Sequence, residues 1–135
     1  MFRTSFIAFA FFGCAWPAFA LERGDLVGDW QTQWANAAGQ APEGGGPMRV
    51  TADSSEDSLD GVTPAPGWDG VMNGEVETSA DGALVWSGHW ASIWREGTTT
   101  GTFRFVFKDS NSFTGTWSSD DGVVAGAAWN GQRAR

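Results

Sequence analysis

Large apolar residues recur at every second position through the second half of this sequence. Within residues 83–94, Leu84, Trp86 and Trp90 fall at even offsets, and three phenylalanines alternate with other residues in the run that follows. Because side chains of a β-strand point to opposite faces in turn, this period of two indicates strands with one buried face. The pattern matches no helix, and we predict an all-β protein whose interior is filled with aromatic rings.

Turn signals between the alternating runs divide them into strands. Asp81-Gly82, which joins two such runs, is a strong hairpin signal. Consecutive strands joined by short turns form an antiparallel meander. We expect about seven strands, or eight if one long run bends at Gly88, closing into a small barrel or a rolled sheet. Strands are predicted at residues 26–34, 48–51, 71–78, 83–94, 99–108, 112–118 and 123–130.

Two segments lack an alternating pattern and are predicted to be irregular. Residues 36–47 include three consecutive glycines, which favour irregular structure. Residues 53–70 are acidic and contain Pro64 and Pro66. Loops of this length inside a compact domain are usually functional or disordered. We therefore expect a long acidic loop at residues 53–70.

The first twenty residues have the pattern of a cleaved secretory signal peptide. Arg3 is followed by an apolar stretch, and Ala18-Phe19-Ala20 fits the small-x-small rule of a cleavage site. The stretch is too short for a membrane span, and we expect residues 21–135 to form a single domain that is secreted or periplasmic. The alternative is a bacterial lipoprotein acylated at Cys14. That residue is the only cysteine, so the domain itself has no disulfide and no thiolate metal site.

Composition limits the partners and explains the core. Acidic residues outnumber Lys and Arg by 16 to 8, and the net charge is −8. Such a surface repels phosphate groups, so nucleic acids and anionic membrane surfaces are not expected as partners. Aliphatic residues are scarce for a chain of this charge, a balance typical of disorder. Eight tryptophans after residue 20 reverse that expectation, because each can bury about 150–250 Å².

The segment Gly28-Asp29-Trp30 resembles the start of calycin barrels, the group that contains lipocalins and avidins. In those proteins the tryptophan plugs one end of an up-and-down barrel, and a basic residue near the end of the chain packs over it. The resemblance implies that Arg133 takes this place, where a guanidinium over an indole contributes roughly 0.5–2 kcal/mol. Gly-x-Trp recurs twice more, a style also found in small exported bacterial proteins. A glycine at that spacing leaves room for a ring from a neighbouring strand.

Tryptophans near strand ends are the candidate ligand-binding residues. Trp34 and Trp94 end predicted strands, and Trp68 follows Pro-Ala-Pro-Gly in the acidic loop, where it can contact a ligand or anchor the loop. Exposed indoles of this kind can stack on sugar rings or small aromatic ligands. The other large rings and the C-terminal arginine are assigned to the structural core: Trp30, Trp86, Trp90, Phe105, Trp117, Trp129 and Arg133.

No catalytic or metal constellation stands out in the sequence. Asp53, Glu56, Asp57 and Asp60 offer oxygen ligands of the kind that calcium prefers. The segment lacks the central glycine and the final glutamate of a helix–loop–helix calcium site, so a solvated acidic loop is the favoured interpretation. His89 is the only histidine and is predicted to point away from the tryptophan face, so no Ser-His-Asp arrangement is expected. We expect no cofactor.

The function predicted from these features is non-catalytic binding by an exported domain. The partner is a small apolar molecule, a glycan or a protein. One alternative is a periplasmic protease inhibitor, because small inhibitors of secreted metalloproteases also use calycin-like barrels and insert the segment before the barrel, here residues 21–26, into the enzyme. The other is a hydrolase that uses carboxylates, which need only converge in space.

Overall fold

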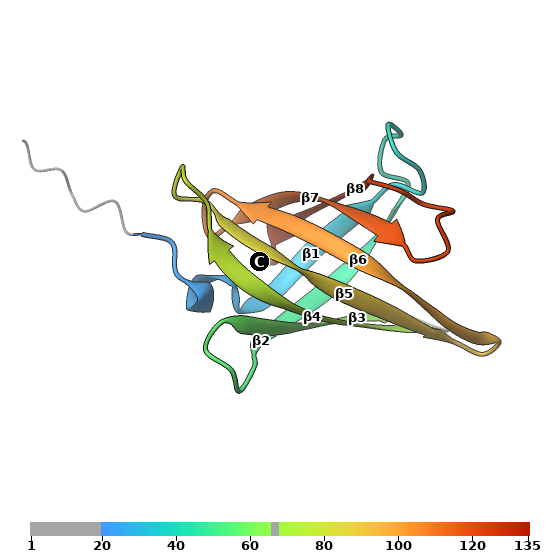
Figure 1. Cartoon of the computed structure of the whole chain (residues 1–135), viewed down its shortest axis with the longest axis horizontal. Helices are drawn as coiled ribbons and strands as arrows, with labels where there is room; N and C mark the ends of the chain where they lie inside the picture. The colour runs from blue at the N-terminus through green and yellow to red at the C-terminus, as the bar shows by residue number, and fades with distance from the viewer. Residues whose placement is uncertain (1–19, 66–67) are drawn as a thin grey trace, which may run out of the picture.

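The computed structural model describes residues 20–65 and 68–135, and the side chains of Ala65, Trp68 and Trp94 lie outside the description. The predicted signal peptide, but for its last residue, is also outside the described residues. None of the residues described belongs to a helix with the length and apolar character needed to cross a membrane. A short 3-10 helix precedes eight strands (Figure 1): η1 (Arg23–Leu26), β1 (Gly28–Trp34), β2 (Gly44–Ala52), β3 (Ser58–Ala65), β4 (Trp68–Thr78), β5 (Leu84–Trp94), β6 (Gly97–Phe107), β7 (Ser112–Ser119) and β8 (Ala127–Arg133).

The strands form a closed antiparallel barrel in which each strand pairs with its neighbours in sequence. The last strand, β8, returns to pair with β1, so that Trp30 lies opposite Arg133 and Trp34 lies opposite Trp129. The predicted all-β meander is therefore confirmed, and it closes into a barrel of eight strands. The strand β5 continues unbroken through Gly88, so this run supplies one strand and not two. The eighth strand is β3, which lies in the segment predicted as a loop.

The two ends of the barrel differ (Figure 1). The closed end holds η1 together with the β2–β3, β4–β5 and β6–β7 turns, and the Leu26 side chain there is fully buried. At the open end, pairing between β2 and β3 stops at Arg49 and Val62, and pairing between β6 and β7 stops at Gly101 and Ser119. The strands β3 to β6 run on past their neighbours as a four-stranded flap, and the β5–β6 hairpin projects farthest.

The segment predicted as a long acidic loop, residues 53–70, contains strand β3 and the start of β4, which corrects that prediction. The strand β3 pairs with β2 on one side and β4 on the other. Its buried positions are Leu59, Gly61 and Thr63, and only the leucine is a large apolar residue. A Cβ atom on Gly61 would lie 2.9 Å from the indole of Trp86, so a ring from β5 fills the space that β3 leaves. The acidic loop shrinks to residues 53–57.

The second strand is longer than predicted, because its glycines lie under a ring. It begins at Gly44 rather than at residue 48. Gly44 lies opposite Trp34 across the β1–β2 pair, and a Cβ atom there would collide with the Trp34 indole. The absence of a side chain at Gly44, which the sequence analysis interpreted as a loop signal, is therefore what lets the Trp34 ring pack against β2.

Two strands begin at least two residues later than predicted. The first strand starts at Gly28 instead of residue 26, because the preceding residues form η1. The last starts at Ala127 instead of residue 123, because Gly122 and Gly126 turn the chain with φ values of +78° and +70°. Such left-handed backbone favours glycine. Val123, in this turn, is left 81% exposed.

Aromatic rings fill the barrel. Trp86 and Phe105 are fully buried. Trp86 meets Phe103 edge-on, with 4.8 Å between ring centroids, and Phe105 stacks on Phe113 at 4.3 Å. Aromatic pairs of this kind contribute about 0.5–1.5 kcal/mol beyond the area they bury. A core of rings thus supports a domain that has few aliphatic residues.

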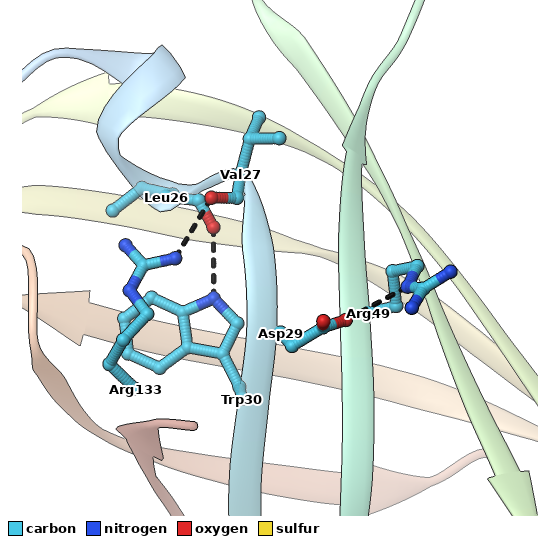
Figure 2. Close-up of polar contacts among 6 residues, drawn as sticks. All are labelled: Leu26, Val27, Asp29, Trp30, Arg49 and Arg133. Atoms are coloured by element: carbon cyan, nitrogen blue, oxygen red, sulfur yellow. Dashed lines mark hydrogen bonds and ion pairs between the residues drawn. The ribbon is translucent and has the colours of Figure 1, made fainter. Parts of the chain in front are cut away.

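A polar clamp holds the closed end together (Figure 2). The Arg133 guanidinium carbon lies 4.1 Å from the centroid of the Trp30 ring. The guanidinium donates hydrogen bonds to the carbonyl of Val27 at 2.8 Å and to that of Ser110 at 2.8 and 3.1 Å. The Nε1 of Trp30 donates to the carbonyl of Leu26 at 2.9 Å. The contact between Arg133 and Trp30 is the one that the resemblance to calycin barrels implies.

Arg133→Lys should lower the free energy of unfolding by about 1–2 kcal/mol, because an ammonium cannot make the same fork of hydrogen bonds or stack as a plane on the indole. Burial lowers the pKa of Arg133, and the charge of Asp25 opposes that shift. Urea unfolding followed by circular dichroism measures the change. Arg49→Lys is the matched control, because Arg49 pairs with Asp29 on the exposed outer face at 2.8 Å and should tolerate lysine without measurable loss. Equal losses in both variants would contradict the clamp.

Candidate functional site

A cavity of about 410 Å³ lies at the open end of the barrel. It sits where β1, β5 and β7 finish and where β4, β6 and β8 begin, and the β7–β8 turn forms part of its wall. In Figure 1 this is the end from which the β5–β6 hairpin projects. Sites for small molecules usually have volumes of roughly 300–1,000 Å³.

Four tryptophans line the cavity: Trp34, Trp90, Trp117 and Trp129. They form two edge-to-face pairs. Trp34 and Trp129 have ring centroids 5.9 Å apart, and Trp90 and Trp117 have centroids 5.6 Å apart. Trp90 and Trp129 are buried, and the other two are half-buried. The cavity therefore lies on top of the aromatic core and shares its outermost rings.

Hydrogen bonds fix the orientation of two of these indoles. The Nε1 of Trp90 donates to one carbonyl of β6 and one of β7, each at 3.1 Å. The Nε1 of Trp117 donates to the carbonyl of Ala35 at 2.9 Å. The buried Nε1 of Trp129 is different, because it has no hydrogen-bond partner among the described residues. Leaving such a donor unpaired costs about 1–3 kcal/mol.

Glycines on the neighbouring strands make room for these rings. A Cβ atom on Gly101 would lie 2.5 Å from the Trp90 indole and closer still to the carbonyl oxygen of Ser118. Gly44 has the same relation to Trp34. The walls of the cavity are therefore set by missing side chains on β2 and β6 as much as by the tryptophans.

The polar part of the wall includes hydroxyl groups and one carboxylate. Thr63 and Ser92 are buried on the inner face of the flap. Asp121 lies in the β7–β8 turn, where its Oδ1 accepts hydrogen bonds from the Ser119 hydroxyl at 2.6 Å and the Val123 N–H at 3.0 Å. These two hydrogen bonds lower the pKa of Asp121 below its ordinary value, and the bond from Ser119 has the larger effect. No Lys, Arg or His from the described part of the chain lines this cavity.

The structure places one of the three predicted ligand-binding tryptophans, Trp34, in the cavity wall. The backbones of Trp68 and Trp94 lie opposite each other in the flap, but their side chains are outside the description. Three indoles assigned to the core from the sequence, those of Trp90, Trp117 and Trp129, line the same cavity. The alternation of large residues shows which face a ring occupies, but it does not show how near the mouth of the barrel the ring lies.

Sequence reasoning missed the polar wall. A signal existed for Ser92, which follows Trp90 by two residues and so shares its face. None existed for Thr63, because its segment was not recognised as a strand. Asp121 belongs to a pattern, Asp120-Asp121-Gly122, that is typical of a turn. Its place beside the cavity follows from the barrel closing around it.

The acidic candidates for calcium do not gather at one point. Asp53 and Asp60 both accept hydrogen bonds from the amide of Asn73, at 3.0 and 2.6 Å. Glu56 and Asp57 lie in the exposed β2–β3 turn. In residues 20–65 and 68–135, no group of three or more His, Cys, Asp or Glu is placed so as to hold a metal ion.

Comparisons with known proteins support the fold alone. No protein-family model matches the chain, and no curated protein matches it. A solved structure described as a redesigned β-barrel is similar, with a TM-score of 0.61 and 19% identity over 83% of this chain and 94% of that chain. The fold and the site define the class as a closed, eight-stranded antiparallel β-barrel with a small cavity at one end, an architecture consistent with a binding protein.

Proposed function

We propose that this chain is an exported, calycin-like barrel that binds a small and mainly apolar molecule in the cavity at its open end, without transforming it. The observation that carries the proposal is a cavity of about 410 Å³ walled by four indoles. Ligand sites are mostly apolar with a few placed polar groups, and Thr63 and Ser92 supply hydroxyls of that kind. The Arg133–Trp30 clamp supports the calycin kinship, and the signal-like residues 1–20 support export.

The two alternatives have less support. A protease inhibitor of this type needs a free segment before the barrel, yet Arg23 donates to the carbonyls of Ser55 and Ser58 at 3.0 and 2.5 Å, and Leu26 is buried. A hydrolase needs two carboxylates that face one cavity. Asp121 is the only carboxylate from the described ranges that lines the open-end cavity. Asp60 and Asp120 both line a separate hollow, where they accept hydrogen bonds from Asn73 and Thr100.

Trp34→Ala should weaken ligand binding by at least about tenfold, which corresponds to roughly 1.4 kcal/mol, while the domain stays folded. The indole is half-buried and forms one wall of the cavity, so its removal takes contact area from the ligand more than from the core. A panel of neutral, cationic and anionic small molecules is first screened by quenching of tryptophan fluorescence. Each hit is then titrated by calorimetry into both proteins.

Trp86→Phe is the control for that experiment, because it also removes one indole but does not change a residue that lines the cavity. We expect Trp86→Phe to lower stability and to leave the affinity of the folded protein unchanged. A ligand whose affinity falls equally in both variants does not occupy this cavity. A panel in which no compound binds contradicts the proposed function.

A further inference from the structure

The charged side chain that lines the open-end cavity is negative. Asp121 is the carboxylate in its wall, and the described residues bring no basic side chain to it. Arg23 and Arg133 donate hydrogen bonds at the closed end, and Arg49 pairs with Asp29 on the outer face. The whole chain carries a net charge of −8. An anionic ligand thus finds no counter-charge here, and a cationic one does.

We propose that the ligand of this cavity is a small organic cation, a substituted ammonium whose alkyl groups pack against the indoles and whose positive charge faces Asp121. This inference rests on the proposed function and names the chemical class of its ligand. Indole is the aromatic ring that attracts cations best, and cages of aromatic rings recognise quaternary ammonium groups.

The polar atoms of the indoles favour the same choice. An anion or a strong hydrogen-bond acceptor needs donors, but the N–H groups of Trp90 and Trp117 already donate to backbone carbonyls. The N–H of Trp129 has no partner among the described residues, but it is shielded from solvent. What these rings can offer a ligand is their apolar and π-electron surface, which carries partial negative charge.

The carboxylate is held in place before a ligand arrives. The hydroxyl of Ser119 and the N–H of Val123 fix one oxygen of Asp121, and they lower the pKa of this carboxyl below its ordinary value. The hydroxyls of Thr63 and Ser92 add neutral oxygen atoms to the wall. Rings, a fixed carboxylate and hydroxyl oxygens together form a site that stabilises positive charge.

The first test compares choline with its neutral carbon analogue, in which a carbon atom replaces the quaternary nitrogen. Both have nearly the same shape, so a difference in affinity reports the charge. Titrations of the unmodified domain, followed by tryptophan fluorescence at a constant ionic strength of about 0.15 M, should show choline binding at least about tenfold more tightly. Equal affinity for the two compounds overturns the proposal but leaves the proposed function standing.

The second test removes the charge and keeps the turn. Asp121→Asn retains an oxygen that can accept from Ser119 and Val123, and it should weaken choline binding several-fold without changing the affinity for the neutral analogue. Asp120→Asn is the matched control, because it makes the same change of charge one residue away. Asp120 accepts from the Thr100 hydroxyl and does not line this cavity. Circular dichroism checks that both variants fold.

Each outcome decides the proposal. A larger loss of choline affinity in Asp121→Asn than in Asp120→Asn supports the proposal. Equal losses mean that only the overall negative charge matters, and they overturn the assignment to Asp121. If a neutral or anionic compound from the wider panel binds in the cavity while choline and other ammonium compounds do not, the charge assignment is wrong and the binding function survives. If nothing in the panel binds, both fail together.

Discussion

Trp30→Ala is expected to lower the free energy of unfolding by about 3–5 kcal/mol, the range for large-to-small changes in a packed core. The indole is fully buried and meets Phe107 and Phe113 edge-on, with centroids 5.3 and 5.5 Å away. Its loss also removes the surface on which Arg133 rests and the hydrogen bond to the carbonyl of Leu26. Urea unfolding, monitored by circular dichroism and extrapolated to water, measures the effect.

The matched comparison is Trp34→Ala, the same substitution four residues along the same strand. Trp34 is half-buried at the open end, so its removal should cost clearly less stability than removal of Trp30. A larger loss for Trp34→Ala would place the main core at the open end and would contradict the assignment of the closed end as the packed one.

Gly101→Ala should be nearly as damaging, at about 3 kcal/mol or more, although it adds a single methyl group. That carbon would overlap the carbonyl oxygen of Ser118 on β7 and would lie 2.5 Å from the Trp90 ring. Backbone cannot rotate out of the way as a side chain can, so β6 and β7 must separate. The loss is measured as the shift in the urea midpoint, with near-ultraviolet circular dichroism reporting the Trp90 environment.

Gly46→Ala is the control for that substitution. Gly46 also lies in a strand, but a Cβ atom there meets only the tip of the Trp34 ring, at an ordinary contact distance of 3.8 Å. We expect little or no loss of stability. If Gly101→Ala is as harmless as Gly46→Ala, the two strands are farther apart than the structure places them.

Most of the barrel could be predicted because strands with large buried residues carry their own signal. The three phenylalanines of β6 and the tryptophans of β5 mark the inner face directly. The strand β3 carries no such signal, since Gly61 and Thr63 follow Leu59 on its inner face. Its buried volume is supplied by Trp86, which is distant in sequence. A pattern read along one strand cannot reveal volume donated by another.

The same limit applies to the cavity. The sequence places Trp90 and Trp117 on inner faces, but such rings can either fill the interior completely or line a cavity that opens to solvent. Which one forms depends on where neighbouring strands stop pairing, and β2 and β3 part at Arg49 and Val62. That separation is a property of the closed sheet. Asp121 reaches the cavity only because the β7–β8 turn lies beside this opening.

The parting of β2 and β3 also bears on self-association. A strand that leaves its neighbour exposes N–H and C=O groups, and such edges recruit other chains into growing sheets. Each of the two diverging stretches carries a proline, Pro47 in β2 and Pro64 in β3. Proline has no N–H to offer an incoming strand, so it interrupts the ladder that polymerisation requires. The two prolines thus lower the risk of fibril growth from the edges that β2 and β3 expose at the open end.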